Sequence, residues 1–332
     1  MAEQPKQLHQ SSIIIDSQVG ANFDFGALKG GGVTAFNYTL TWTAESAAET
    51  MPAVAQALDL DTIFPGEIMQ VERVEDIERA KQDNKVGIIF GLQGMALIGR
   101  GLHWVRILHK LGVRIGGIVY NESGVIGCSC AEPTDSGLTF FGRQVVNEMN
   151  RLGMVIDLSH SGDRTSMDAV NVSSTPVIIS HSNPRRLVNH PRNVPDDLMK
   201  AVASRGGVIG LANYRPLLDS GEKAPTVDKW LDHIDYVVNL VGIDHVGIGT
   251  DADVWSRQMW ISYMIRYKDL VPQIAQYMRP DMLDHNTHNI EGFADHRDLP
   301  KITDGLLRRG YAEDAVQKIL GQNFLRVFRE VW

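Results

Sequence analysis

Two histidines each end a short apolar run of this sequence, at positions where they could act together on a metal ion. Met154–His160 is the first run and Pro176–His181 is the second. Each run predicts a buried strand with an imidazole at its carboxyl end, which is where an α/β barrel keeps its chemistry. Neutral imidazole is a good ligand for zinc and similar metals. A single histidine here could serve only as a hydrogen-bonding group, but two on successive strands, each after a serine, favour a shared ligand role for His160 and His181.

An aspartate and an arginine stand where they could complete such a site. Asp251 follows Gly247–Thr250 at the end of the last predicted strand. A carboxylate there can bind a metal ion, orient a water molecule or accept its proton, although it can also cap the next segment. Arg192 lies in the loop His190–Asn193, after the sixth predicted strand. Its guanidinium suits a substrate carboxylate through two parallel hydrogen bonds, and an ordinary surface arginine is an equally good interpretation.

The elements that must position these residues are eight short apolar runs. They comprise residues 12–16, 32–38, 86–93, 113–120, 154–160, 176–181, 207–214 and 245–251. Nearly continuous apolarity, rather than alternation, is typical of strands buried on both faces, as in parallel sheets. Helical patterns lie between the runs and after the last one, at residues 144–151, 196–204, 227–241, 304–309, 313–320 and 323–331.

Eight alternations of strand and helix predict a (β/α)8 barrel. The alternative is a doubly wound sheet, which normally carries a glycine-rich phosphate loop after an early strand, whereas Gly30–Gly32 precedes a strand. We therefore expect a single barrel domain over residues 1–332, with C-terminal helices. Residues 254–298 form a long insertion after the last strand, rich in Trp, Tyr, Met and His, and we interpret it as a lid or an interface.

Composition limits the function classes. Hydrophobic residues make up 43% of the chain and charged residues 22%, which is typical of a globular protein with a large core. The formal net charge is −8 and no basic run is longer than Arg308-Arg309, so a nucleic-acid partner is not expected. The first residues are polar and no stretch of about 18 apolar residues occurs, so we expect neither a signal peptide nor a membrane span. With Cys128 and Cys130 as the two cysteines, a cytoplasmic location fits best.

Seven segments spread over most of the chain carry a family resemblance. They are Leu138–Arg143, Asn150–His160, Ile179–Asn183, His190–Asn193, Gly206–Gly210, Gly242–Asp251 and Gly321–Phe328. Together they resemble the membrane (renal-type) dipeptidase family, peptidase family M19. The resemblance implies a (β/α)8 barrel of the amidohydrolase type that carries two zinc ions. It also implies cleavage of dipeptides, including some with a D-residue or a dehydro-residue.

The resemblance assigns roles to four residues and marks departures at four others. His160 and His181 match the two histidine ligands of one zinc, Arg192 matches the arginine that holds the substrate carboxylate, and Asp251 matches the catalytic aspartate. Gln18 and Gly20 stand where the family has a His-x-Asp motif, Gln93 replaces the bridging glutamate, and Tyr120 replaces a substrate-contacting histidine.

These departures change the expected metal content. A neutral carboxamide at Gln93 cannot offset the repulsion between two divalent ions as a carboxylate does, and Gly20 offers no side-chain ligand. We therefore expect the first metal site to be empty. His160 and His181, with Gln93, Asp251 or water, would hold one zinc or other divalent ion at reduced affinity, and complete loss of metal is the alternative.

Three functional hypotheses follow for a small-molecule substrate. The first is a dipeptidase-like hydrolase of an amide that bears a carboxylate, with at most one metal ion, Asp251 as base, and His160 and His181 in the catalytic site. Its substrate contacts are expected from Arg192, Tyr120, Gln18, Gln93 and Asn121. The second is a repurposed barrel that performs metal-independent acid/base chemistry, such as elimination, decarboxylation or condensation. The third, less favoured, is a non-catalytic binding protein. The family resemblance and the long segment 254–298 both favour a homodimer.

Overall fold

The computed structural model describes residues 3–40, 46–221, 224–253 and 290–332. Most of the 254–298 insertion, residues 254–289, lies outside this described part, so the lid or interface interpretation of that segment stays a prediction. Its last residues, 290–298, are described and contain the short helix η4 (His296–Asp298). In the described part of the chain, no helix is long and apolar enough to cross a membrane.

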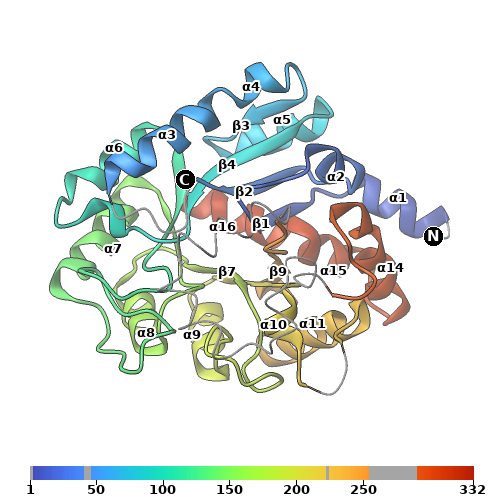
Figure 1. Cartoon of the computed structure of the whole chain (residues 1–332). Helices are drawn as coiled ribbons and strands as arrows, with labels where there is room; N and C mark the ends of the chain where they lie inside the picture. The colour runs from blue at the N-terminus through green and yellow to red at the C-terminus, as the bar shows by residue number, and fades with distance from the viewer. Residues whose placement is uncertain (1–2, 41–45, 222–223, 254–289) are drawn as a thin grey trace.

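Eight parallel strands close into a barrel. The described strands are β1 (Ile15–Val19), β2 (Ala35–Thr39), β3 (Ile68–Gln70), β4 (Val86–Leu92), β5 (Val113–Gly117), β6 (Val155–Asp157), β7 (Ile178–Ser182), β8 (Val208–Leu211) and β9 (Val246–Ile248). The ring runs β1-β2-β4-β5-β6-β7-β8-β9 and returns to β1 through the pairing of Asp16 with Ile248. The short β3 pairs only with the beginning of β4, beside the ring. The predicted (β/α)8 fold is confirmed (Figure 1), and each of the eight predicted runs overlaps a barrel strand.

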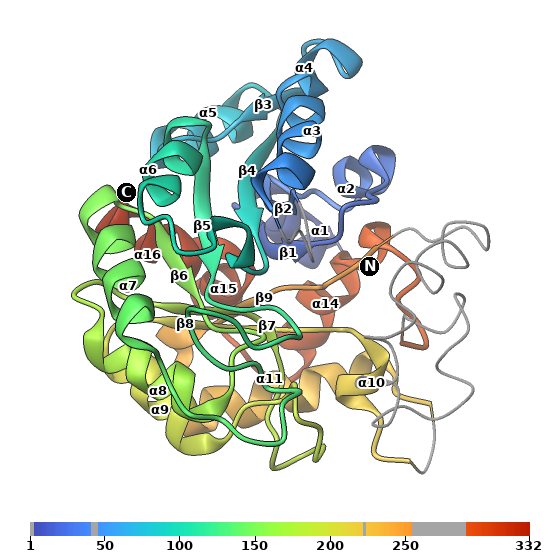
Figure 2. The same cartoon turned by 60° about the vertical axis from the view of Figure 1, so that its left-hand side comes forward.

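Helices surround the strands (Figure 2). Those in the first half are α1 (Glu3–Ser11), α2 (Phe25–Gly30), α3 (Ala47–Leu58), α4 (Leu60–Ile63), α5 (Val74–Gln82), η1 (Ala96–Ile98), α6 (His103–Lys110) and α7 (Phe140–Leu152). Those after them are α8 (Asp163–Val172), α9 (Asp196–Ser204), α10 (Arg215–Leu218), α11 (Val227–Val241), η2 (Ile243–His245), α14 (Pro300–Arg308), α15 (Glu313–Gln317), η5 (Lys318–Gln322) and α16 (Asn323–Val331). The predicted C-terminal helices are therefore present.

Side-chain caps and glycines explain where several of these helices start and stop. Thr139 begins α7 by accepting a hydrogen bond from the backbone N–H of Gly142, and Thr226 begins α11 in the same way. Gly153 ends α7 in the left-handed conformation, with φ of 72°, which costs glycine little because it has no Cβ. The ends of the helices in turn fix where the next strands can begin.

The C-terminal helix α16 closes the amino-terminal end of the barrel. Ile15, Ile89, Ile178 and other strand residues that face the barrel interior share one buried cluster with Phe324, Leu325, Val327, Phe328 and Val331 of α16. Gly247 of β9 has no side chain, and a Cβ added to it would lie only 2.8 Å from Cδ2 of Phe324. The phenyl ring therefore packs directly on the backbone of β9. The opposite, carboxyl end of the barrel is left for polar residues.

A layer of small residues separates this apolar floor from the polar mouth. Ser17 donates hydrogen bonds from its Oγ to the backbone oxygens of Ser180 (2.5 Å) and Ile248 (2.9 Å), across the inside of the barrel. A Cβ added to Gly210 would lie 2.6 Å from that same Oγ, and one added to Gly249 would lie 2.7 Å from it. Gly210 and Gly249 therefore leave room for Ser17 to connect strands that do not pair with each other.

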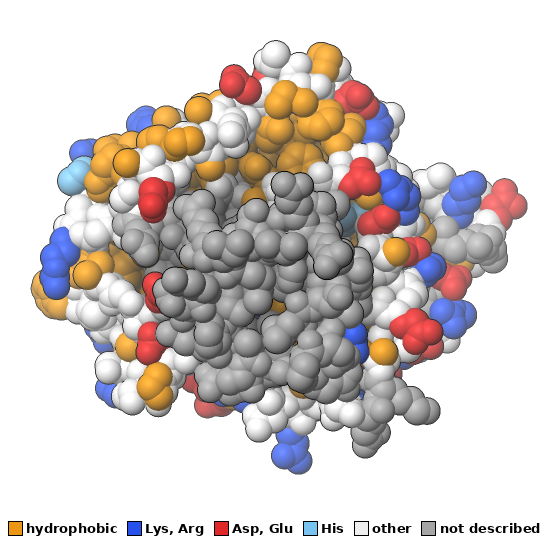
Figure 3. All heavy atoms as spheres, in the orientation of Figure 1, with side chains coloured by type: hydrophobic (Ala, Val, Ile, Leu, Met, Phe, Trp, Pro, Cys, Tyr) orange, Lys and Arg blue, Asp and Glu red, His pale blue; other side chains and the backbone are white. Residues whose placement is uncertain are grey.

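Large apolar side chains are exposed at several places on the surface, among them the helices α3 and α4. Figure 3 shows hydrophobic side chains gathered over α3 and α4, where Leu58 is 46% and Ile63 61% exposed. Acidic and basic side chains are interspersed around the rest of the described part of this face (Figure 3).

Candidate active site

His160 and His181 lie against each other in the mouth of the barrel. Their Nε2 atoms are 3.0 Å apart, and both side chains are buried. β6 and β7 are paired neighbours, and His160 lies three residues beyond the end of β6. The register between β7 and β8 shifts between Ile179 and Ser182. Such an irregularity re-aims side chains, and Ser180 and His181 both make contacts inside the barrel.

A buried hydrogen-bond network fixes the orientation of both imidazoles. Asp157 accepts hydrogen bonds from Ser159 Oγ (2.6 Å) and Ser180 Oγ (2.5 Å). Because Ser180 Oγ donates to Asp157, it accepts a hydrogen bond from His181 Nδ1 at 2.6 Å. His160 Nδ1 donates to the carbonyl oxygen of the Asn121 side chain at 2.8 Å. Each ring therefore carries its proton on Nδ1.

This protonation pattern leaves two nitrogen lone pairs facing each other. With both Nδ1 atoms protonated, both Nε2 atoms are acceptors, and two acceptors 3.0 Å apart cannot hydrogen-bond to each other. A bound cation would relieve this contact. Burial and the nearby Arg192 lower the pKa of both histidines well below the ordinary value, which disfavours an extra proton between them. The chemistry of this pair of donors therefore fits one metal ion.

The residues around Gln18 do not fit a second ion. Gln18 and Gln93 both donate their side-chain N–H groups to Thr39 Oγ1, the latter at 3.1 Å. Gln18 Oε1 in turn accepts from the Asn37 side chain at 3.2 Å. This is a network of neutral groups, and no set of three or more His, Cys, Asp or Glu side chains in the described residues is arranged to hold a metal. Among the described residues, the donors around Gln18 therefore do not fit a second ion.

Gly20 leaves space that another residue occupies. A Cβ at position 20 would lie 2.5 Å from Oδ2 and 2.6 Å from Cβ of Asp253, so the Asp253 carboxylate fills the place of a side chain at this position. Asp253 Oδ1 accepts a hydrogen bond from the backbone N–H of Asn22 at 3.0 Å. Burial raises the pKa of the Tyr38 hydroxyl, and the negative charge of Asp253 raises it further. Sequence reasoning assigned no role to Asp253, although its spacing from Asp251 was a usable signal.

Arg192 is buried at the ends of β6 and β7. Its guanidinium donates to the backbone oxygens of Ser159 and, at 3.1 Å, His181, and therefore ties together the two segments that carry the imidazoles. Its side chain has no carboxylate within salt-bridge distance among the residues that the structure describes. A buried guanidinium with unused N–H groups is a ready partner for an anion.

Asp251 lies at the end of β9 in a strained conformation. Its φ of 54° places a non-glycine residue in the left-handed region, a kind of strain that is often found at functional sites. Burial raises the pKa of its carboxyl to about 7; Arg192 opposes this shift, and the charges of Asp16 and Asp157 add to it. Asp16 is itself held by Thr250 Oγ1 at 2.5 Å and by His296 Nε2 at 2.9 Å. The sequence had not singled out His296.

Tyr120 and Asn121 both reach His160 from beyond the end of β5. The Tyr120 ring packs on the His160 ring with centroids 4.3 Å apart, and Asn121 makes the hydrogen bond to Nδ1 described above. The structure therefore brings both residues to the histidine pair, together with Arg192. Cys128 and Cys130 are free thiols in the loop that follows.

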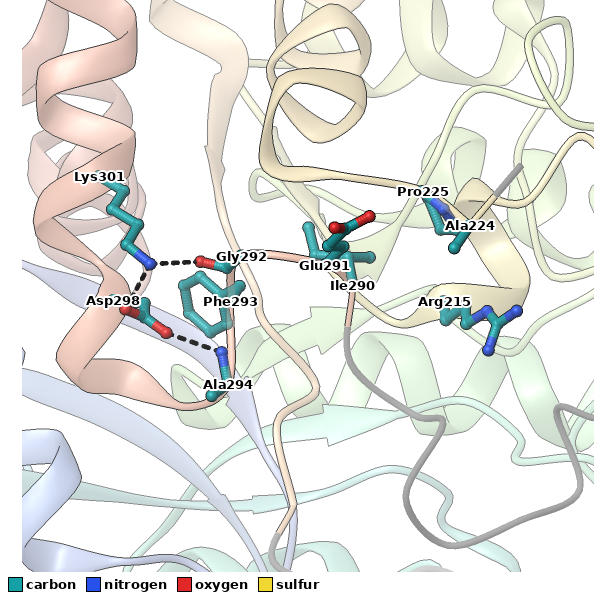
Figure 4. A pocket seen from close by; sticks show the side chains of 10 residues that line it. All are labelled: Arg215, Ala224, Pro225, Ile290, Glu291, Gly292, Phe293, Ala294, Asp298 and Lys301. Atoms are coloured by element: carbon teal, nitrogen blue, oxygen red, sulfur yellow. Dashed lines mark hydrogen bonds and ion pairs between the residues drawn. The ribbon is translucent and has the colours of Figure 1, made fainter.

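A separate pocket lies outside this constellation. It is formed by Ala224 and Pro225 before α11, by Arg215, and by residues 290–294, Asp298 and Lys301, with a volume of about 610 Å³ (Figure 4). Lys301 donates to the backbone oxygen of Gly292 at 2.7 Å and pairs with Asp298 at 2.8 Å. None of the predicted site residues lines it.

Comparison with known proteins identifies similar proteins that are named dipeptidases. Residues 5–281 and 280–332 match the family model of membrane dipeptidase, peptidase family M19. Dipeptidase tcpJ of Claviceps purpurea is 31% identical over 271 residues, which are 81% of this chain and 56% of that protein. The chain thus spans little more than half the length of this curated relative, and the same holds for dipeptidase aclJ of Aspergillus oryzae, at 57%.

Solved structures agree with the fold. An amidohydrolase from Pseudomonas aeruginosa has a TM-score of 0.88 at 34% identity, covering 99% of both chains. The structure of dipeptidase AC, a metallopeptidase of family M19, has a TM-score of 0.81 at 20% identity, covering 97% of this chain and 99% of the other. At this identity the similarity is evidence for the fold and not for the function.

Proposed function

Because the chain belongs to the membrane dipeptidase family, peptidase family M19, we propose that it hydrolyses the amide bond of a small dipeptide-like molecule that bears a carboxylate. The observation that carries this proposal is the convergence of Arg192, Asp251 and the facing histidines on one barrel mouth. The positive charge of Arg192 lowers the pKa values of Asp251, His160 and His181, which supports the proximity of all three residues to the arginine.

Each group has a distinct part in the proposed reaction. Arg192 binds the substrate carboxylate through the N–H groups that the Ser159 and His181 oxygens leave free, and so orients the amide. Asp251 takes a proton from the attacking water and delivers it to the departing amine. With a pKa of about 7, it populates both protonation states near neutral pH. A group that first accepts a proton and then donates it requires both states.

The proposal includes at most one metal ion for each chain. His160 and His181 would hold it through Nε2, and when bound it would lower the pKa of a water molecule and polarise the amide carbonyl. Asp157, through Ser180, and Asn121 orient the two imidazoles for this role. Tyr120 packs on His160 and would contact the substrate beside it.

Elemental analysis and a hydrolysis assay together test this proposal. The purified protein is analysed for metals and assayed on a panel of dipeptides, with and without added zinc. We expect no more than one ion per chain, and activity that a chelator removes and zinc restores. His181→Ala should abolish metal binding, whereas His245→Ala, which changes a histidine at the far end of β9, should preserve it. Two tightly bound ions, or an absence of dipeptide hydrolysis in the metal-loaded protein, would contradict the proposal.

One observation favours metal-independent acid/base chemistry as a second candidate. The hydrogen bonds of Gln18 and Gln93 to Thr39 satisfy these groups without any ion. Asp251 would then exchange protons with a small substrate in an elimination, decarboxylation or condensation. Turnover of such a substrate by protein from which all metal has been removed, together with inactivity on dipeptides, would select this candidate over hydrolysis.

A further inference from the structure

His296 is a buried histidine that takes no direct part in the proposed proton transfer. It begins the short helix η4, which packs against α2. Gly31 permits this close approach, since a Cβ added to it would lie 2.6 Å from the backbone carbonyl carbon of His296. The His296 side chain is only 5% exposed, so its imidazole must find hydrogen-bond partners inside the protein.

One of these partners is Asp16 of β1, which is fully buried. Because the Asp16 carboxylate accepts hydrogen bonds, Nε2 of His296 carries a proton and donates a hydrogen bond to Oδ2 at 2.9 Å. Thr250 donates to the same oxygen through Oγ1 at 2.5 Å, and to Oδ1 through its backbone N–H at 2.9 Å. A buried carboxylate keeps one orientation only while its oxygens are satisfied, so His296 helps to fix Asp16.

Thr250 in turn fixes the backbone on both sides of Asp251. Its Oγ1 donates to Asp16 and accepts a hydrogen bond from the backbone N–H of Ala252 at 3.1 Å. The backbone N–H of Asp251 donates to Gln18 O at 2.9 Å. Residues 250–252 therefore form a turn that is clamped to β1 around a residue with φ of 54°. A residue with a Cβ keeps this conformation only when its surroundings impose it, so the clamp is what holds the Asp251 carboxylate in its place.

We propose that His296 is a positioning residue for Asp251. Its imidazole holds the Asp16 carboxylate, this carboxylate holds Thr250, and Thr250 holds the 250–252 turn. The inference deepens the proposed function and rests on it, because it concerns the group that we propose to transfer protons. The helix η4 therefore supports the reaction from outside the ring of strands.

The location of this chain of hydrogen bonds predicts an effect on kcat rather than on KM. Arg192, the proposed carboxylate-binding group, is bonded to the segments at the ends of β6 and β7, and neither of these strands pairs with β1 or β9. Loss of the His296 hydrogen bond should therefore leave substrate binding in place. Because a displacement of about 1 Å at a reacting group can cost about a hundred-fold in rate, we expect kcat to fall about ten- to a hundred-fold.

A matched pair of substitutions tests the role of the His296 donor on a panel of dipeptides. His296→Leu removes the N–H group, whereas His296→Gln keeps a side-chain N–H that can reach Asp16. The leucine variant should lose kcat at unchanged KM, and the glutamine variant should recover most of the loss. Thr250→Val breaks the same connection one step later and should behave like the leucine variant. The control is His245→Leu, which removes a histidine bonded to Gly207 O at the opposite end of β9 and should keep the wild-type kcat.

Hydrogen exchange reports on the turn without any substrate. In His296→Leu and in Thr250→Val, the backbone amides of residues 250–252 should exchange about tenfold faster than in the wild type, and in His296→Gln they should exchange at the wild-type rate. Mass spectrometry of a short peptide that covers these residues measures the rates. Thermal unfolding shows whether each variant is folded, and if the leucine variant is not, Thr250→Val provides the same comparison.

A leucine variant that keeps the wild-type kcat, or whose 250–252 amides exchange at the wild-type rate, would overturn the inference. Equal losses of kcat in the leucine and glutamine variants would overturn it as well, because the hydrogen-bond donor would then not matter. If the wild type hydrolyses no dipeptide, the proposed function fails, and the exchange rates alone decide whether His296 holds the turn.

Discussion

The raised pKa of Asp251 predicts a particular dependence of stability on pH. In the unfolded chain an aspartate titrates near its ordinary value of 3.8, whereas the folded protein raises this pKa to about 7. Between these values the folded state holds a proton that the unfolded state has released. The free energy of unfolding contributed by this group is therefore fully present below about pH 4 and is lost as the pH rises through about 7.

The expected magnitude follows from the size of the shift. About three pKa units correspond to ~4 kcal/mol at ~1.4 kcal/mol for each unit. Because the Asp251 side chain is partly exposed, solvent screening reduces this figure, and we expect ~2 kcal/mol. Asp251→Asn removes the titration, since a carboxamide is neutral at every pH. The variant should therefore gain stability relative to the wild type as the pH increases from about 5 to 8.

Urea unfolding of both proteins across this pH range measures the effect. The histidines of the site titrate in both proteins, so the difference between the two curves isolates Asp251. Asp228→Asn serves as the control for removing one negative charge from an exposed site, its side chain being 75% exposed. If the difference between wild type and Asp251→Asn is constant from pH 5 to 8, Asp251 is not perturbed as described, and its proposed exchange of protons near neutral pH is refuted.

Three further substitutions test the parts of the barrel that hold the site. Gly249→Ala should lower the free energy of unfolding by ~2–4 kcal/mol, because its Cβ would lie 2.7 Å from Ser17 Oγ, whereas Gly124→Ala, with open space around it, should have little effect in the same urea titration. Asp157→Asn should cost ~2–4 kcal/mol and weaken zinc binding measured by calorimetry, and retained affinity would show that the network does not orient His181. Phe324→Ala should cost ~3–5 kcal/mol by urea unfolding, and a loss below ~1 kcal/mol would mean that α16 contributes little to the barrel floor.

The barrel was predictable from the sequence because its strands are buried on both faces. Such strands are nearly continuous apolar runs, as in 86–93, and the glycines that end helices, such as Gly153, mark the boundaries. The short strand β3 was missed because Ile68–Gln70 is too brief to show a pattern. Tyr120 was predicted at a strand end, but β5 ends at Gly117, so the tyrosine lies in the loop beyond.

The site was only partly predictable, because irregular backbone decides where its side chains point. The pairing of β1 with β2 shifts register between Asp16 and Val19, and Gln18, within this irregular stretch, reaches Thr39. The position of Asp253 beside Gly20 depends on contacts between segments far apart in the sequence, such as that of Asn22 with Asp253, which no local pattern contains. The tautomers of the two histidines likewise depend on their hydrogen-bond partners, such as Ser180. These partners are known only from the three-dimensional arrangement of the strands.

The position of α16 under the barrel has a consequence for the order of folding. The helix comes after all eight strands in sequence, yet Phe324 and Phe328 complete the same cluster as Ile15 of the first strand. During synthesis the early strands must wait, without their final partners, until this helix has left the ribosome. Contacts of such long sequence separation are typical of slow folding and expose apolar strands to aggregation in the meantime. The emergence of α16 should therefore set the moment at which the barrel becomes resistant to proteolysis.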